Sequence, residues 1–203
     1  MLYTNTDLGH FAKDPAVIEL DRYYYMYHSI MADKKLGIGV ARSKDGDSFE
    51  RIALFPQNQE CEQKGVGAPA AIVIDGIVHL FYQTYGNGKL DAICHATSCD
   101  GVNFDKDETN PIFAPRGPYM AMPEWSCGRA IDADVCIFGT KLLLYWATRD
   151  REFKRQIVGV AAAPLDSGFG RGSFEGYPDI VLEPTLPWEK DCIEAPAAMV
   201  RDG

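Results

Sequence analysis

Two aspartates and one glutamate stand at the start of short apolar segments that lie far apart in the chain. Asp14 lies in KDPAV, Asp132 in RAIDADV and Glu194 in IEAPA. Three carboxyl groups around one pocket can supply a general base, a general acid and a group that tunes their pKa values. Hydrolysis of a glycosidic bond uses such a set. Each carboxylate taken alone is better explained as a solvated residue at a strand start. The case for a shared site therefore depends on the elements that position all three.

Those elements repeat. The chain contains one pattern four times: an apolar strand, a polar turn, and a second strand that ends in an aromatic residue, any residue, and Ser or Thr. Tyr27, Tyr82 and Trp146 occupy the aromatic position in the three complete copies. The dipeptides Asp45-Gly46 and Asp100-Gly101 are typical of turns between strands, which indicates a third and a fourth strand in each repeat. Antiparallel units of three or four strands are the blades of a β-propeller.

The spacing of the repeat supports this fold. The equivalent positions Pro15, Pro69, Ala133 and Pro196 are separated by 54, 64 and 63 residues, a longer period than the roughly 40 to 50 residues of WD40 or kelch blades. Helical periodicity is scarce, and Gly and Pro interrupt the chain every few residues. We therefore predict an all-β propeller. A β-sandwich is the alternative, but it does not predict a period near 60 residues.

We expect a single, incomplete propeller domain over residues 1–203. Its blades are expected at residues 1–60, 61–125 and 126–190, with the start of a fourth at 191–203. Closed propellers have typically 4 to 8 blades, so we expect the chain to be the front part of a longer protein. The open blade edge would then be a surface for self-association.

In a propeller the first strand of each blade lines the central channel, so residues at the heads of these strands converge. Asp14, Ala68, Asp132 and Ala195 occupy equivalent head positions, and Glu194 precedes its head position by one residue. Because side chains alternate along a strand, that offset aims Glu194 differently from the two aspartates. Proline restricts the residue before it, so we expect Asp14 to be held in an extended conformation.

The motifs KDPAV, RAIDADV and IEAPA, in this order and spacing, resemble glycoside hydrolase family 43 and its relatives, five-bladed β-propellers that include arabinofuranosidases, xylosidases and arabinanases. The resemblance covers nearly the whole chain. It implies that Asp14 is the general base, Asp132 the group that modulates the pKa of the acid, and Glu194 the general acid of an inverting hydrolysis. Ala133 and Ala195 stand where many members have Pro and Gly, which leaves the subfamily open.

Four further residues are candidates for binding a sugar. Trp125 and Trp188 lie in proline-containing loops before Asp132 and Glu194, and each is either a platform for a sugar ring or an anchor for its loop. Arg129 can pair with a pocket carboxylate, bind a sugar hydroxyl or lie on the surface, and His10 borders the pocket or is a loop histidine. We expect the proline-rich segment 107–128 to form one rim of the cleft.

The composition limits the classes of partner that the chain is expected to bind. A formal net charge of -9 argues against nucleic acid and anionic membranes, and the chain lacks both a long apolar run and the features of a signal peptide. We expect a soluble protein whose compartment is open. The six cysteines have no spacing suited to zinc, so we predict buried free thiols rather than a metal site or a disulfide framework. No cofactor is required, and the resemblance leaves a structural cation such as calcium to a fifth blade.

The function that these observations favour is an enzyme that removes a terminal pentose, L-arabinofuranose or D-xylose, from plant-type polysaccharides or oligosaccharides. One alternative is another enzyme on a related propeller, such as a mannoside phosphorylase, for which Arg129 and Arg149 are the suggestive phosphate ligands. A second alternative is a propeller that binds carbohydrate or assembles without turnover.

Overall fold

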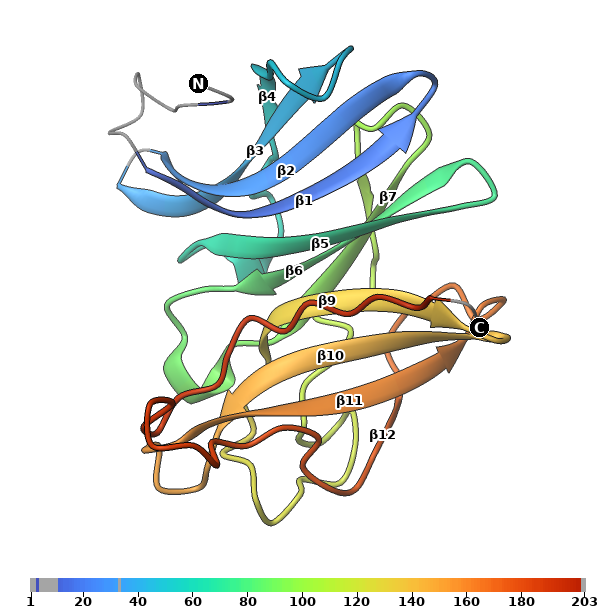
Figure 1. Ribbon diagram of the computed structural model, residues 1–203. Helices are drawn as coiled ribbons and strands as arrows, with labels where there is room; N and C mark the ends of the chain where they lie inside the picture. The colour runs from blue at the N-terminus through green and yellow to red at the C-terminus, as the bar shows by residue number, and fades with distance from the viewer. Residues whose placement is uncertain (1–2, 4–10, 33, 202–203) are drawn as a thin grey trace.

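The computed structural model describes residues 3, 11–32 and 34–201, and the predicted all-β class is confirmed (Figure 1). The strands form three antiparallel sheets of four. The first sheet contains β1 (Ala12–Leu20), β2 (Tyr23–Ala32), β3 (Lys35–Ser43) and β4 (Glu50–Leu54). The second contains β5 (Val66–Ile74), β6 (Ile77–Thr84), β7 (Ile93–Ser98) and β8 (Asp105–Lys106). The third contains β9 (Ile131–Phe138), β10 (Lys141–Arg149), β11 (Gln156–Pro164) and β12 (Glu175–Gly176). Two short 3-10 turns lie between strands. One, η2 (Glu60–Glu62), lies between β4 and β5, and the other, η3 (Gly88–Leu90), lies between β6 and β7.

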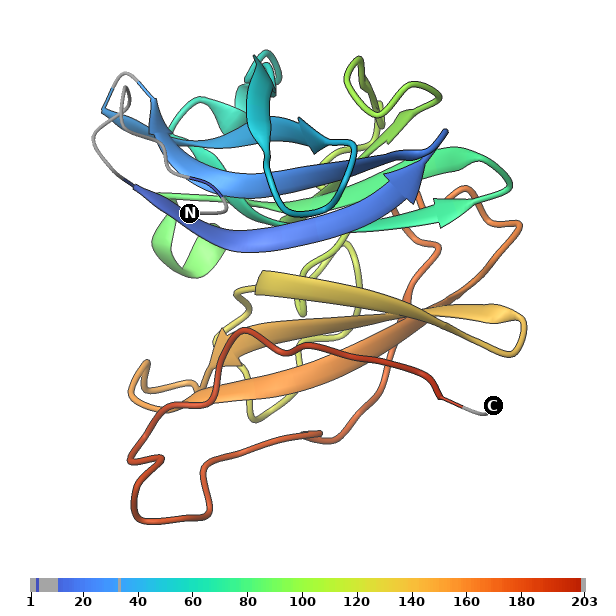
Figure 2. The ribbon, with the colours of Figure 1, turned by 45° about the horizontal axis from the view of Figure 1, so that its top comes forward.

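Each sheet is a simple meander whose strands follow one another in chain order. The first strands of the sheets are neighbours, β1 beside β5 and β5 beside β9, so the sheets stack face to face as blades do (Figures 1 and 2). The segment after β12 returns along β9, where a fourth inner strand would lie (Figure 1). The arrangement is a partial β-propeller, as the repeat predicted.

The core lies between the sheets. Tyr27 and Tyr82 are buried between the first and second sheets, and Phe81 and Trp146 between the second and third. The second sheet packs against the first sheet on one face and against the third on the other, so its strands are buried on both sides rather than alternating. This double burial explains why β7 is buried at nearly every position. In the first sheet, β2 is also buried on both faces from Tyr25 to Ile30.

The inner strands share one irregularity near their first residues. The ladder between β1 and β2 shifts between Lys13 and Ala16, that between β5 and β6 between Gly67 and Ala70, and that between β9 and β10 between Ile131 and Asp134. In each case two residues of the inner strand lie opposite one residue of its partner, which is a β-bulge. The first bulged residues are the predicted heads of the blades, Asp14, Ala68 and Asp132.

The bulge corrects the conformation predicted for Asp14. Its φ is 55°, and the equivalent residues Ala68, Asp132 and Ala195 have φ values of 43°, 47° and 53°. The expectation of an extended residue held by proline was wrong, because Asp14 is the first bulged residue and has the left-handed φ that the first bulged residues of all three blades share. Non-glycine residues at positive φ are uncommon and carry strain. The recurrence at Ala195 shows that the repeat continues into the fourth copy in the predicted register.

The strand registers also correct the aromatic alignment. The residues opposite the three bulges are His28, Tyr82 and Trp146, so Tyr27 stands one position away from the place shared by Tyr82 and Trp146. The motif of an aromatic followed by Ser or Thr misled the alignment because β2 is apolar on both faces, and Tyr27 is as completely buried as the other two.

The cysteines agree with the prediction in part. All six are free, but only Cys94 and Cys136 are buried, and Cys99 and Cys192 are exposed. Cys99 lies in the turn between β7 and β8 and Cys192 in the segment after β12, where no further sheet covers them. Within the described part of the chain, no helix has the length and apolarity needed to cross a membrane.

Candidate active site

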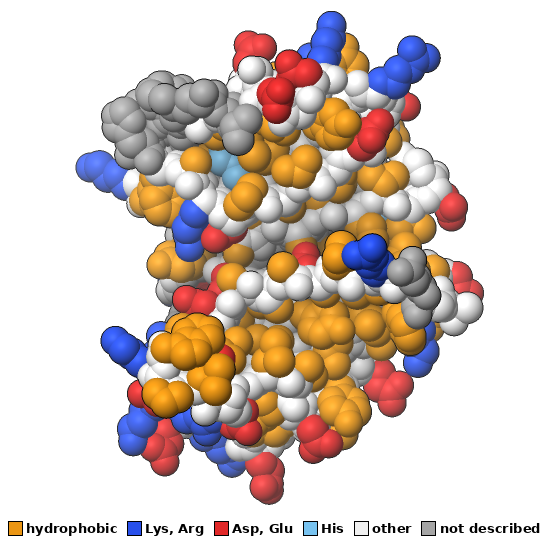
Figure 3. Space-filling model, in the orientation of Figure 1, with side chains coloured by type: hydrophobic (Ala, Val, Ile, Leu, Met, Phe, Trp, Pro, Cys, Tyr) orange, Lys and Arg blue, Asp and Glu red, His pale blue; other side chains and the backbone are white. Residues whose placement is uncertain are grey.

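A cavity of about 440 Å³ opens between the inner strands of the three blades and the segment that follows β12. In Figure 3 the surface is hollowed between β1 and this C-terminal segment. The heads of the blades contribute Asp14, Ala68, Asp132 and Ala195 to its wall. The head positions predicted to converge therefore line one cavity, although they are up to 181 residues apart in sequence.

Asp14 stands at the mouth of this cavity with its side chain 25% exposed. The Ser29 hydroxyl donates a hydrogen bond of 2.8 Å to Oδ2 of Asp14, and the Lys13 ammonium lies 3.3 Å from the same oxygen. Both of these contacts are made to Oδ2, so they orient the carboxylate. A carboxylate oriented in this way at the wall of a cavity is suited to act as a general base.

Asp132 is the more enclosed carboxylate. Its backbone N–H donates to the side-chain oxygen of Gln83 over 2.6 Å. Burial raises the pKa of Asp132 to about 6, and the negative charges of Glu194 and Asp14 add to the shift. The charges of the other two predicted acids therefore act on Asp132.

Glu194 lies at the edge of the same cavity. Its side chain is exposed, and the residues that follow it, Ala195 to Ala198, form part of the wall. The side-chain amide of Gln156, in β11, donates a hydrogen bond to Oε2 of Glu194. The offset of one residue from the head position thus places this carboxylate at the rim rather than in the floor.

Sequence reasoning missed two buried residues that hold the blade heads. Ser29 accepts a hydrogen bond of 2.8 Å from the backbone N–H of Ala68, the head of the next blade, while its own hydroxyl donates to Asp14. Gln83, at the equivalent position of β6, accepts from the head of the third blade, Asp132. The signal for both is a polar residue inside an otherwise apolar strand. In the structure Ser29 is 0% exposed and Gln83 is 3% exposed.

Asp134 was missed as well. It lines the cavity on the strand of Asp132 and accepts a hydrogen bond of 2.5 Å from the backbone N–H of Ala198. Burial raises the pKa of its carboxyl. The repeated aspartate in RAIDADV was the available signal, since residues two apart on a strand share a face. Asp134 fastens the C-terminal segment to β9.

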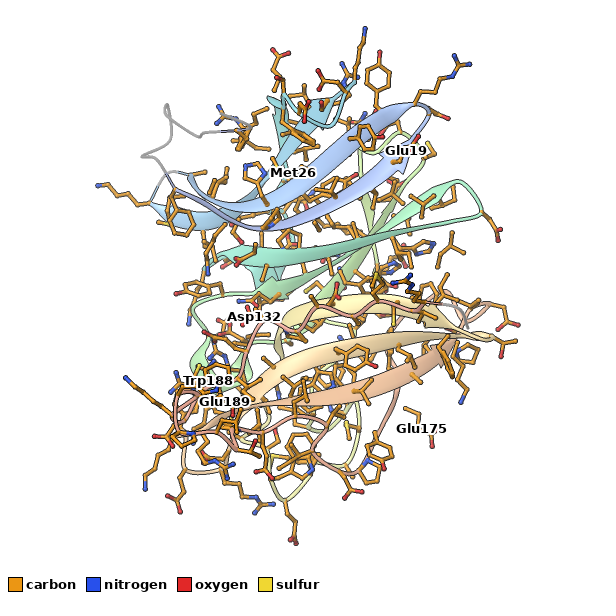
Figure 4. All side chains as sticks on the ribbon, in the orientation of Figure 1. Glu19, Met26, Asp132, Glu175, Trp188 and Glu189 are labelled. Carbon is orange, nitrogen blue, oxygen red and sulfur yellow. The ribbon has the colours of Figure 1, made fainter. Side chains whose placement is uncertain are left out.

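The two tryptophans proposed to bind sugar have different surroundings. Trp188 is 75% exposed and lies at the end of the molecule where Asp132 stands, opposite to Glu19 (Figure 4). Trp125 is half-buried, stacks on Trp146 with ring centroids 5.5 Å apart and donates from its indole N–H to the carbonyl of Pro178. Trp188 is free to meet a ligand, whereas the contacts of Trp125 are those of a loop anchor.

The remaining candidates are Arg129, His10 and the segment 107–128. The guanidinium of Arg129 is 3.5 Å from the carboxylate of the buried Asp91, so its pairing partner is not one of the three acids. His10 lies outside the described residues. The segment 107–128, expected at the rim, contributes no residue to the cavity wall. Its residues 112–114 are buried between the second and third sheets instead.

The donor set of the cavity is made of carboxylates and small apolar residues. Within the described residues there is no cluster of three His, Cys, Asp or Glu side chains that could hold a metal ion. Two carboxylates with different surroundings and a third at the rim can perform proton transfer in both directions, one removing a proton and another supplying it.

No protein-family model and no curated protein sequence matches the chain. Solved structures do. A thermostable family-43 glycoside hydrolase matches with a TM-score of 0.68 and 20% identity over 93% of this chain and 58% of that chain. A family 117 glycoside hydrolase of the marine bacterium Zobellia galactanivorans matches with a TM-score of 0.64 and 19% identity over 88% of this chain and 58% of that one.

A third match is a structure from the GH130 family of mannoside phosphorylases, which contains glycoside hydrolases that target β-1,2 mannosidic linkages, with a TM-score of 0.60 and 15% identity over 83% of this chain and 50% of that one. The chain thus spans between half and three fifths of the length of these three structures. At such identities the comparisons establish the propeller fold.

Proposed function

We propose that this chain carries the catalytic carboxylates of a glycoside hydrolase of the propeller type. One observation carries the proposal: Asp14 and Asp132, heads of two blades, line one cavity with Glu194 at its edge. Burial in this cavity, and after it the charges of Glu194 and Asp14, raise the pKa of Asp132. The fold similarity to glycoside hydrolases of families 43 and 117 supports the same reaction class. Strained φ values at the blade heads accord with a functional site.

The proposed mechanism follows from the surroundings of each acid. Asp14, oriented by Ser29 through Oδ2, uses Oδ1 to take a proton from a water molecule. The oxygen of this water attacks the anomeric carbon while the bond from that carbon to the leaving oxygen breaks. Glu194 donates its proton to the leaving oxygen. Attack from the face opposite to the leaving group inverts the anomeric configuration.

Asp132 acts on this reaction through its charge. Burial, and after it the negative charges of Glu194 and Asp14, raise the pKa of Asp132 to about 6. Asp132 therefore gains or loses its proton near this pH, which changes the charge that the other two acids face across the cavity. We assign the modulating role to Asp132 because it is the most enclosed of the three.

The proposed substrate is a terminal pentose, L-arabinofuranose or D-xylose, of a plant-type polysaccharide or oligosaccharide. A cavity of about 440 Å³ is of the size that encloses a single small ligand rather than a long chain segment. Trp188, exposed at the same end of the molecule, offers a ring face to the apolar side of a sugar.

Hydrolysis is favoured over phosphorolysis by the state of the two suggestive arginines. Arg129 is paired with Asp91, and Arg149 donates to Gln156 and to the carbonyl of Phe153. A phosphate in the cavity would have to compete with these partners. The mannoside-specific reaction of the GH130 relatives therefore remains the second choice.

The test is turnover of p-nitrophenyl α-L-arabinofuranoside, β-D-xyloside, β-D-galactofuranoside and α-L-fucoside by the protein as its full gene encodes it. We expect release of nitrophenol from one pentoside and a loss of about 10²- to 10⁴-fold in kcat for Asp14→Asn. Glu194→Gln should also lower kcat, by less than on a phenyl glycoside of the same sugar, because nitrophenolate leaves more readily without an acid. Glu19→Gln, an exposed glutamate at the far end of the inner strand of Asp14, is the matched control.

Proton NMR of the first product distinguishes inversion from retention. A folded protein that releases no sugar from any glycoside, with or without phosphate, would refute the proposed function and favour a carbohydrate-binding propeller. Release only in the presence of phosphate would establish the phosphorylase.

A further inference from the structure

Gln156 connects the proposed general acid to the rigid part of the third blade. It is the first residue of β11, and its side chain and backbone are together only 7% exposed. Its amide nitrogen Nε2 donates a hydrogen bond to Oε2 of Glu194, and its amide oxygen Oε1 accepts one of 2.9 Å from Arg149 Nη2. The amide therefore bridges a cation and a carboxylate.

The two neighbours permit only one orientation of this amide. A guanidinium has donors and no acceptor, so it must face the amide oxygen, and the amide nitrogen is then left to donate to Oε2 of Glu194. Arg149 is itself fixed, since Nη1 donates to the carbonyl of Phe153 and the guanidinium lies 4.7 Å from the centre of the Phe153 ring. Gln156 thus presents an N–H group to Glu194 in a direction set by β10.

The backbone of Gln156 holds the chain that leads to Glu194. Its N–H donates to the carbonyl of Asp191 over 2.8 Å, and its carbonyl accepts from the N–H of Ile193 over 3.1 Å. The segment 191–195 belongs to no assigned strand apart from a parallel bridge between Gln156 and Cys192. Both the side chain of Glu194 and the residues before it therefore take their position from one residue.

The hydrogen bond from Gln156 to Glu194 differs from the hydrogen bonds that hold the blade heads elsewhere. In β2 and β6 the heads of the next blades are held by Ser29 and Gln83, one on each strand. The equivalent position of β10 is Ala147, which pairs with Ile131 and has no polar side chain to offer. In the fourth copy the next strand outward supplies a hydrogen bond instead, from Gln156 to Glu194, the residue before the head.

We propose that Gln156 is the positioning residue of the general acid and that Arg149 acts by orienting Gln156. This inference rests on the proposed function and adds to it the group that aims the proton of Glu194 at the leaving oxygen. The Cys192 thiol also contacts Glu194, but a thiol is a weak donor on an exposed turn and gives the carboxylate no fixed direction.

The leaving group tests this inference. An acid is needed when the leaving oxygen is basic and hardly needed when it is acidic, so a misaimed acid lowers kcat for a phenyl glycoside much more than for a dinitrophenyl glycoside of the same sugar. For Gln156→Leu we expect a loss of about 10- to 100-fold in kcat on the phenyl glycoside and less than about 3-fold on the dinitrophenyl glycoside, with KM little changed. Arg149→Met should give the same pattern with smaller losses.

Three comparisons make the outcome decisive. Glu194→Gln should show the same dependence on the leaving group, more strongly, and Gln57→Leu, which removes an amide that donates to the carbonyl of Leu36 in the first blade, should show none. Far-UV circular dichroism and the thermal midpoint establish that each variant is folded.

Equal losses on both glycosides, or none, in a folded Gln156→Leu protein would overturn this inference while Glu194→Gln upholds the proposed function. If Gln156→Leu does not fold, Gln156→Asn, which keeps an amide too short to reach Glu194, takes its place in the same comparison. Failure of the unaltered protein to turn over any glycoside would instead refute the proposed function itself, and this inference with it.

Discussion

Replacing Asp132 with asparagine should make the folded protein more stable at neutral pH. The amide has nearly the shape of the carboxyl and leaves intact the backbone hydrogen bond from residue 132 to Gln83. What it removes is a negative charge that is partly buried and lies near Glu194 and Asp14. Enzyme sites often carry such strained groups at a cost in stability.

The size of the effect follows from the pKa. Folding raises the pKa of Asp132 from 3.8 to about 6, and each pKa unit corresponds to about 1.4 kcal/mol. The folded state thus binds this proton more tightly than the unfolded state, and the carboxyl destabilises the fold increasingly as the pH rises from about 4 to above 6. The full cost at pH 7 is about 3 kcal/mol as an upper bound, since the group retains some contact with water.

Urea unfolding of the unaltered protein and of Asp132→Asn between about pH 4 and pH 8 measures this cost. We expect the variant to be more stable by up to about 3 kcal/mol at pH 7 and above, and the difference to shrink to near zero at pH 4. Asp166→Asn, at an exposed position, is the control and should show no such trend. A difference that stays constant with pH would refute the reasoning.

Three further predictions concern other parts of the chain. Ser29→Ala removes the bond to Asp14 and leaves a buried backbone N–H without its acceptor, so we expect a loss of about 2–4 kcal/mol in the free energy of unfolding, measured with urea; a loss below about 0.5 kcal/mol would contradict this. Trp188→Ala should raise KM for the glycoside and leave the thermal midpoint unchanged, because this indole is exposed; an unchanged KM would remove it from the site. Gly159→Ala places a Cβ 2.4 Å from the Trp146 ring and should destabilise the protein by about 1–3 kcal/mol in the same urea assay; a fully stable variant would show that the ring can move aside.

The sequence predicted the blade heads because their chemistry is local and repeated. Asp14, Ala68, Asp132 and Ala195 stand at the same place in four copies of one pattern, and the structure gives all four the same left-handed φ. The dipeptides Asp45-Gly46 and Asp100-Gly101 likewise lie in the connections to the fourth strands, where both glycines have positive φ.

The sequence pattern led to a wrong alignment where a strand is buried on both faces and therefore lacks the alternation of polar and apolar residues. Alternation of polar and apolar residues sets strand register, but β2 is apolar on both faces, so Tyr27 was aligned one position away from Tyr82 and Trp146. The conformation of Asp14 was wrong for a related reason, since the bulge is a property of the pairing between two strands and not of the Asp-Pro step.

What the sequence determined by itself is the set of strands, their grouping into blades and the identity of the carboxylates at the blade heads. These features depend on residues close together in the chain, on the residues that form turns, and on a strand pattern that repeats along the sequence. Only the tertiary structure decided that Asp14 and Asp132 line one cavity with Glu194 at its edge, and that the pKa of Asp132 rises to about 6. It also decided that Ser29 and Gln83 hold two of the heads and that Gln156 holds Glu194. Electrostatic coupling and hydrogen bonds between blades depend on distances and burial that arise when separate sheets pack, and no local pattern encodes them.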